Sequence, residues 1–212
     1  MKGSYTRYKL MAAFTALLDR YEFDDITVSK ITSLCGVSRQ AFYKNFESKQ
    51  DLCRQMIATL FRDCLGDAES FTWEQLSEAY LGQMKLFMEF FHTLASRQYY
   101  MLTAEAIFGH VSKACRAMTG FSGAKKGDGD MEAVIGCYCI GVTHAYMTMI
   151  SRGTTMDPIL VTKRLRLAMP EALQRLMLGR VFPMRVHRDL FPGSENDGFR
   201  RFSAFLSRFR DE

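Results

Sequence analysis

Four polar side chains can lie on one side of a short predicted helix near the N-terminus. They are the guanidinium of Arg39, the amide of Gln40, the phenol of Tyr43 and the ammonium of Lys44. Guanidinium and amide groups hydrogen-bond base edges in the major groove of DNA, and phenol and ammonium groups hold phosphates. We therefore predict that this helix reads DNA, with Arg39 and Gln40 directed at the bases.

A helix-turn-helix over residues 27–46 is the element predicted to position these groups. Thr27 can cap its first helix, in which Ile31 and Leu34 share one face through their three-residue spacing. Gly36 can end that helix, because glycine adopts the left-handed conformation without strain. The second helix is expected to have its cap and its inward side chains at Ser38, Ala41, Phe42 and Phe46.

Longer helices are expected on both sides of this motif. Residues 6–20 return apolar side chains at helical spacing and would cover the two short helices, which cannot bury enough surface alone. Residues 48–65 are predicted to form a linking helix, capped by Ser48, with Lys49 as a phosphate anchor at its positive end. The full set of predicted phosphate contacts is Thr27, Ser38, Tyr43, Lys44 and Lys49.

Ten residues extend this pattern: Ile31, Cys35, Gly36, Val37, Ser38, Phe42, Tyr43, Phe46, Lys49 and Leu52. With them, residues 5–60 resemble the DNA-binding domain of the tetracycline-repressor (TetR) family. The chain departs from the family at Thr32 and Cys35, where alanine is usual, and at Asn45, where histidine or tyrosine is frequent. The alternative is an ordinary pair of short helices in an all-helical core. The resemblance implies a homodimer that binds a palindromic operator in double-stranded DNA.

The composition of the 212-residue chain indicates an all-α protein of one or two domains. Apolar residues make up 48% of the chain, and it has only four prolines. No long alternating strand pattern is present. The net charge of +5 suits DNA binding but does not require it. We expect a DNA-binding domain over residues 1–65 and a helical effector-binding and dimerisation domain over 66–212, with an atypical tail over 180–212.

The second domain is predicted to begin with a helix over residues 72–95, followed by another over about 99–118. Their Met, Phe and Tyr side chains suit an apolar or aromatic small-molecule effector, in the cavity that the family resemblance implies. Core packing produces the same stripes, so the region is better indicated than any single residue. The candidate ligand contacts are Met84, Phe87, Met88, Phe91, Tyr99 and His144.

Residues 131–151 are the most apolar stretch and are expected to form a dimerisation helix. Its small residues would let another helix approach closely, and they are Gly136, Cys137, Gly141 and Ala145. The resemblance implies that this helix pairs with residues 157–177 across a two-fold axis. In the tail, residues 199–209 form a basic amphipathic pattern, which we expect to pack on the body, with a membrane surface or a partner as the alternative.

Six cysteines occur without a CxxC pair or a histidine at a zinc-like spacing, so we predict no metal site and no cofactor. Their apolar neighbours indicate reduced thiols in the cytoplasm. A redox sensor at Cys137 and Cys139 stays open, although these side chains point about 200° apart on a helix, which disfavours a disulfide between them. Glu132 and His144 argue against a membrane span, and no signal peptide is evident.

These patterns predict a transcriptional regulator, with a ligand-responsive homodimeric repressor as the leading hypothesis. The alternative is an activator or co-regulator whose C-terminal domain binds a protein partner rather than a small molecule. The unusual tail and the scarcity of convergent polar groups motivate that alternative. We do not predict an enzyme, because the sequence has no catalytic triad order, paired carboxylates, metal-ligand spacing or nucleotide-binding loop.

Overall fold

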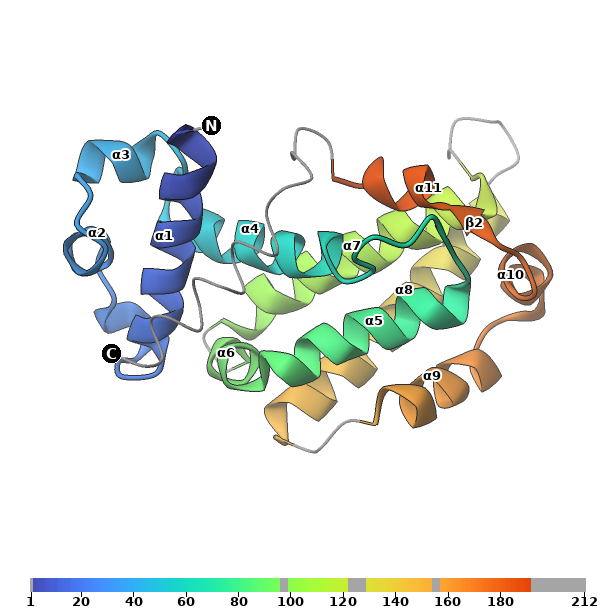
Figure 1. The fold of residues 1–212 in the computed structure, drawn as a ribbon. Coiled ribbons are helices and arrows are strands. Elements are labelled where there is room, and N and C mark those ends of the chain that lie inside the picture. Colours follow the sequence, from blue (N-terminus) through green and yellow to red (C-terminus); the bar gives the residue numbers. More distant parts are fainter. Residues whose placement is uncertain (1, 96–98, 122–128, 154–156, 192–212) are drawn as a thin grey trace.

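The computed structural model describes residues 2–95, 99–121, 129–153 and 157–191, and in this part of the chain nearly all regular structure is helical (Figure 1). The all-α prediction is confirmed. The predicted helix over residues 199–209 lies outside the described residues. The elements are α1 (Lys2–Leu18), η1 (Phe23–Asp25), α2 (Val28–Leu34), α3 (Arg39–Tyr43), α4 (Lys49–Arg62), β1 (Ser70–Phe71), α5 (Trp73–Leu86), α6 (Met88–Leu94), α7 (Tyr100–Thr119), α8 (Gly129–Ser151), α9 (Pro158–Leu167), α10 (Glu171–Met177), β2 (Phe182–Pro183) and α11 (Met184–Arg188).

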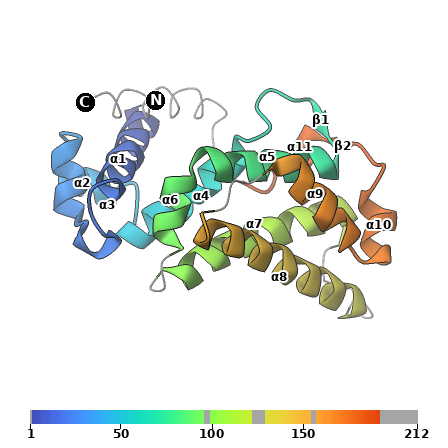
Figure 2. The ribbon, with the colours of Figure 1, turned by 90° about the horizontal axis from the view of Figure 1, so that it is seen from below.

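The head of the molecule consists of α1, η1, α2 and α3, which lie together at one end (Figures 1 and 2). Phe14 from α1, Ile31 from α2 and Phe42 from α3 are fully buried in its core. Leu34, which we expected to share the inward face with Ile31, is 44% exposed. Three steps of 100° leave it about 60° away from Ile31 on the helix. It lines a surface groove with Leu17 and Tyr21 instead.

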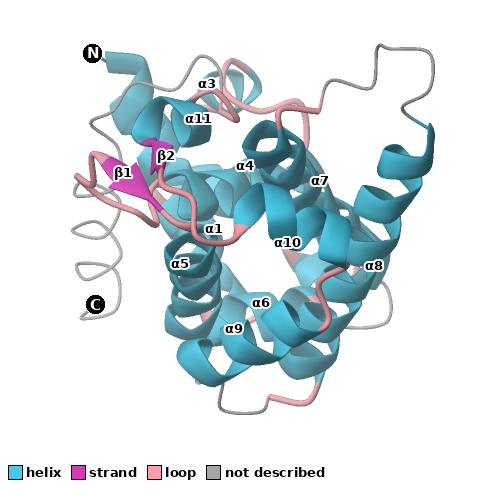
Figure 3. Ribbon diagram, turned by 90° about the vertical axis from the view of Figure 1, so that its right-hand side faces the viewer, coloured by secondary structure: helices cyan, strands magenta, loops and turns pink. Residues whose placement is uncertain are grey.

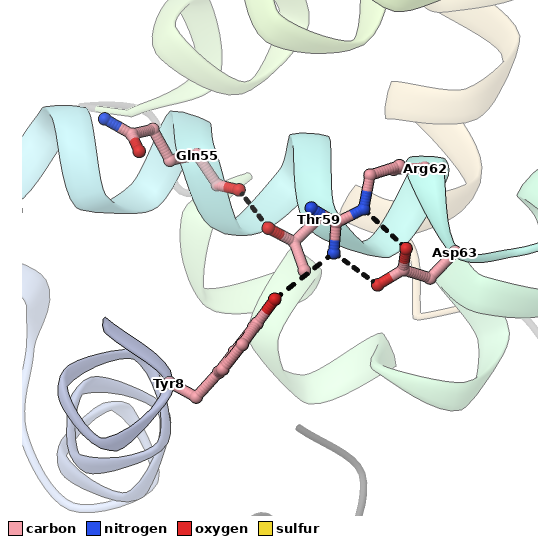
Figure 4. A network of polar contacts seen from close by, with 5 residues as sticks. All are labelled: Tyr8, Gln55, Thr59, Arg62 and Asp63. Atoms are coloured by element: carbon pink, nitrogen blue, oxygen red, sulfur yellow. Dashed lines mark hydrogen bonds and ion pairs between the residues drawn. The ribbon is translucent and has the colours of Figure 1, made fainter. Parts of the chain in front are cut away.

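Helix α4 joins the head to the body, which we define as residues 70–191. Along α4, Leu52, Met56 and Phe61 are fully buried. At its C-terminal end, Arg62 donates hydrogen bonds to Asp63 and, at 3.4 Å, to the hydroxyl of Tyr8 on α1 (Figure 4). A neighbouring bond in the same figure runs from Thr59 to the carbonyl of Gln55. Because α1 and α4 are tied in this way, the head follows the direction of α4.

The body is built on a hairpin of α7 and α8, with α5 and α9 packed together beside it (Figures 1 and 3). The single helix predicted over residues 72–95 is divided at Phe87, whose backbone leaves the helical region (φ −110°, ψ 34°). The sequence does not signal this break, because no proline or glycine adjoins Phe87. A second unpredicted feature is the short antiparallel pairing of β1 with β2, in which Phe71 lies opposite Phe182. This pairing places the start of the tail against the beginning of the body.

One buried and one partly buried histidine lie where α11 covers α7. His187 on α11 is 0% exposed, and the rings of His187 and His110 each lie 5.3 Å from the ring of Phe191. His110 also contacts Phe61 of α4 edge-to-face at 5.6 Å. Burial lowers the pKa of each imidazole to about 4, because the charged form loses its hydration. Both histidines are therefore neutral in the folded protein near neutral pH.

We predict that acidification destabilises this cluster. As pH falls below about 6.5, the unfolded chain binds protons on His110 and His187 while the folded protein does not until about pH 4. The free energy of unfolding should therefore fall by about 2–5 kcal/mol across this window. Urea unfolding at a series of pH values measures this change in the free energy of unfolding. Replacing both residues with Gln should flatten the slope, whereas the exposed His92→Gln control should not. An unchanged slope in the double variant would contradict this prediction.

Candidate DNA-binding surface and body cavity

Local hydrogen bonds fix the helix-turn-helix as predicted. The hydroxyl of Thr27 accepts from the backbone N–H of Lys30 at 3.2 Å, and that of Ser38 accepts from the N–H of Ala41 at 3.1 Å. Each bond satisfies one of the donors left free at a helix start. Gly36 lies between the helices at φ +65°, in the left-handed region where a side chain would add strain. The turn therefore sets the angle between α2 and α3.

Helix α3 separates its apolar and polar groups cleanly. Phe42 is fully buried and Ala41 is half-buried, whereas Arg39, Gln40 and Lys44 are exposed. Tyr43 is 53% exposed, and the ring of Phe42 packs edge-to-face against its ring at 5.4 Å. The structure thus brings the four predicted DNA-reading groups to one outer surface of the head. Their contacts with DNA remain a prediction.

Lys49 has a partner inside the protein. Its ammonium donates to the carbonyl of Phe23 at 2.5 Å and lies 4.3 Å from the centre of the Phe23 ring. Burial lowers the pKa of Lys49, and the nearby carboxylates of Asp24 and Asp25 partly oppose that shift. The residue therefore fastens η1 to the start of α4. A phosphate contact from Lys49 stays a prediction, and it would have to coexist with this internal bond.

A basic residue that we did not predict to bind DNA also lies on the head. Lys30 is exposed on α2, and its ammonium lies 4.0 Å from the centre of the Tyr21 ring. Its position in the first turn of the first helix of the motif could have indicated this role in the sequence. Its charge adds to those of the exposed Arg39 and Lys44 on the head.

The body contains a small cavity of about 40 Å³ between α5, α7 and α8. That volume holds a few water molecules as it stands. Its wall is mostly aromatic and sulfur-containing, and includes Trp73, Tyr80, Cys115, Tyr138, Tyr146 and Met177. We did not predict these aromatic residues as ligand contacts from the sequence. Trp73 and Tyr80 lie two helical turns apart on α5, a spacing that places them on the same side of the helix.

Few polar groups face this cavity, and one of them lacks a partner. The hydroxyls of Ser77 and Thr162 bond each other at 2.9 Å, and Tyr138 donates to the carbonyl of Leu165 at 3.4 Å. The Tyr80 hydroxyl finds no hydrogen-bond partner in the described part of the protein, although Tyr80 is only 3% exposed. Burial raises its pKa well above the usual value, so the phenol is neutral. An unpaired buried hydroxyl is costly, and a bound molecule could satisfy it.

The six predicted ligand contacts do not line this cavity. Met84 and Phe91 are fully buried in the core, and Tyr99 packs against Phe23 of the head with ring centres 4.0 Å apart. The other three lie elsewhere. Phe87 and Met88 line a separate hollow of about 220 Å³ beside the end of α1, and His144 is exposed on α8.

A metal site and a membrane span are two further possibilities on which the structure bears. Among the described residues, no three His, Cys, Asp or Glu side chains are grouped to hold a metal ion. Helix α8 is long and apolar enough to cross a membrane by composition alone. One side of α8 is buried in the protein core, at Ile135, Cys139 and Val142, as in a core helix of a folded body.

The comparisons with known proteins agree with this geometry. Residues 10–56 match the sequence profile of the family described as "Bacterial regulatory proteins, tetR family". Residues 10–56 thus carry the DNA-binding domain of that family, which supports a role as a DNA-binding regulator. Among solved structures it is similar to "Dihydroxyacetone kinase operon activator DhaS", with a TM-score of 0.61 at 13% identity, covering 81% of this chain and 98% of that one. This likeness concerns the fold. No curated protein matches by sequence.

We predict different effects for two substitutions on α3. Arg39→Ala should cost about 1–3 kcal/mol of binding to the preferred DNA sequence and relax the choice of base. Lys44→Ala should weaken binding to all DNA sequences alike. It should also reduce the number of ions released on binding, read from the salt dependence of the affinity, by about one. Affinity measured by fluorescence anisotropy on specific and random DNA over several salt concentrations separates these effects. Identical behaviour of the two variants would contradict the assignment of Arg39 to bases and Lys44 to phosphate.

Proposed function

We propose that the protein is a ligand-responsive homodimeric repressor that binds a palindromic operator. The observation that carries this proposal is the capped helix α3, which presents Arg39, Gln40, Tyr43 and Lys44 outward from a rigid helix-turn-helix. A helix of five residues reads only a few base pairs. Two copies related by a two-fold axis would supply the missing affinity and select a repeated half-site.

An uncovered stripe on α8 supports dimerisation. Ala133, Cys137, Ile140, Gly141 and His144 are all exposed, and they recur at steps of three and four residues along one side of the helix. Ile140 is 60% exposed. A Cβ atom added to Gly141 would meet no described atom within 4 Å, so a second helix could approach closely there. The opposite side of α8 is core, so a twin helix is the natural cover for this side.

The cavity supports control by a small molecule. A mostly apolar wall with the unpaired Tyr80 hydroxyl suits an apolar or aromatic ligand that carries one hydrogen-bonding group. A ligand larger than the present cavity would have to displace α5, α7 or α8. Helix α7 packs on α4, and Tyr99 at its start touches Phe23 of the head. A ligand that binds best to the displaced arrangement would therefore change the spacing of the two α3 helices.

A second candidate function is activation of transcription. It is favoured by the name of the similar structure, which describes that protein as an operon activator. The same DNA-binding head would serve either role. Reporter expression in cells with and without the gene decides between them, because deletion raises expression from a repressed promoter and lowers it from an activated one.

We predict that Ile140→Arg prevents dimer formation and removes the palindromic preference. The arginine charge would be buried without a partner against the twin helix, which should raise the dimer dissociation constant at least about tenfold. Light scattering after gel filtration gives the mass, and selection from random DNA gives the preferred site. The wild type should select two half-sites about one helical turn apart. The control is Met101→Arg on α7, where Met101 is 64% exposed. A monomeric wild type, or a dimeric Ile140→Arg variant, would contradict the proposed interface.

We predict that Tyr80→Phe weakens the response to an effector without weakening operator binding. The substitution removes only the hydroxyl that lacks a partner, so it should also leave the fold intact or stabilise it slightly. A screen of aromatic and apolar compounds for release of the operator provides the effector. Its dissociation constant should rise about five- to tenfold in the variant. An effector that acts equally on both proteins would show that Tyr80 is not a ligand contact.

A further inference from the structure

The head and the body enclose a hollow of about 220 Å³ between them, which we call the junction hollow. One wall lies at the end of α1, at Thr15 and Asp19. The other wall is the joint between α5 and α6, and it consists of residues 85–90. Helix α6 packs beside α1, as two views of the fold show (Figures 1 and 2). A molecule in this hollow would therefore touch the head and the body at once.

The break between α5 and α6 creates the apolar part of the junction hollow. Successive residues of a regular helix point about 100° apart, so six in a row could not all line one hollow. They do so here because the backbone leaves the helical region at Phe87. Leu86 is 61% exposed, and Phe87 and Met88 are half-buried. Apolar surface is thus accessible to a ligand at two of the residues that the sequence predicted as ligand contacts.

The charged side chains of the junction hollow are two carboxylates and one ammonium, so its net charge is −1. Asp19 comes from the head, Glu89 and Lys85 come from the body, and all three are exposed. Their charges form no ion pair with any described residue. The four-residue spacing of Lys85 and Glu89 would favour an ion pair in a continuous helix, but the break at Phe87 lies between them. Both carboxylates are therefore free to pair with a bound cation.

We propose that the junction hollow is a second ligand site, which takes a small organic cation with an aromatic or aliphatic group. The positive group would lie between Asp19 and Glu89, and the apolar group would cover Leu86, Phe87 and Met88. The volume is below the roughly 300–1,000 Å³ of sites for drug-sized molecules, so the ligand is smaller than those. The wall of the body cavity contains no charged residue, so the two sites select different molecules.

A bound cation would also influence the position of the head. Asp19 and Glu89 are like charges on the two walls of the hollow, and a cation between them offsets their repulsion. Binding therefore favours the arrangement in which α1 and α6 lie close together. Helix α1 packs on both helices of the helix-turn-helix, so the direction of α3 relative to the body depends on this arrangement. An effect on operator affinity follows, and this part rests on the proposed function.

The test uses the full-length protein, labelled with ¹³C in its methionine methyl groups, and 2-phenylethylammonium as the probe. Met88 lines the junction hollow and Met177 lines the body cavity, so their methyl resonances report on the two sites separately. The variants Met88→Leu and Met177→Leu identify these resonances. We expect the probe to shift the Met88 resonance saturably and to leave that of Met177 in place.

Matched compounds and variants test the role of charge. The uncharged 2-phenylethanol, which has nearly the same shape, should bind about five- to tenfold more weakly than the ammonium probe. Asp19→Asn and Glu89→Gln should each weaken the probe about threefold. The control is Glu105→Gln, because Glu105 is exposed on α7 and does not line the hollow.

Three results would overturn the proposal. They are a Met88 resonance that the probe does not move, equal affinity for the ammonium and the alcohol, and a shift of Met177 without one of Met88. The titration of the wild type requires no variant other than those that identify the resonances. All three carboxylates chosen for substitution are exposed, so their variants should fold.

Operator binding with and without the probe then tests the regulatory part. We expect about a fivefold change in affinity in the wild type and no change when Asp19→Asn and Glu89→Gln are combined. Binding of the probe without any change in operator affinity would refute the regulatory part alone. Failure of the protein to bind DNA would refute the proposed function and leave the methyl titration unaffected.

Discussion

The burial of α4 along its whole length is the constraint on which the arrangement of the molecule depends. Leu52 and Met56 are fully buried nearer the head, and Leu60 and Phe61 are fully buried nearer the body. Phe61 stacks on Tyr80 of α5 with ring centres 4.4 Å apart and the planes only 18° from parallel. One rigid helix therefore belongs to both cores. Movement of α5 or α7 cannot leave α4 in place, and movement of α4 carries the recognition helix with it.

Several interactions at the junction of head and body also hold α4 and the head together. Lys49 binds the carbonyl of Phe23 at one end of α4, and Arg62 binds Tyr8 at the other. Tyr99, at the start of α7, packs against Phe23 from the body. The η1 turn is thus held by α4 and by α7 at once. A change in their relative position is transmitted to the head through a turn with little room to absorb it.

The head could be predicted from the sequence because its determinants are local. Thr27 and Ser38 bond to N–H groups three residues ahead, and Gly36 provides the turn by its own backbone freedom. The body cavity depends on which sides of several helices face one another, and periodicity within one helix does not contain that information. The break at Phe87 rotates α6 relative to α5, and the predicted contacts in this region lie away from the cavity. The pairing of Phe71 with Phe182 joins residues more than a hundred positions apart.

The two sides of α8 illustrate how one apolar helix can serve two surfaces. Its composition admitted a membrane span, but the structure buries one side against α7 and leaves the other open. The buried side carries Ile135, Cys139 and Val142 into the core, and the open side carries Cys137 and Ile140 toward solvent. If a twin α8 covers the open side, the body cavity and the dimer interface lie on opposite sides of the same helix, because Tyr138, Val142 and Tyr146 line the cavity. A shift of α8 on ligand binding would then move the interface that spaces the two recognition helices, in addition to the path through α7 and α4.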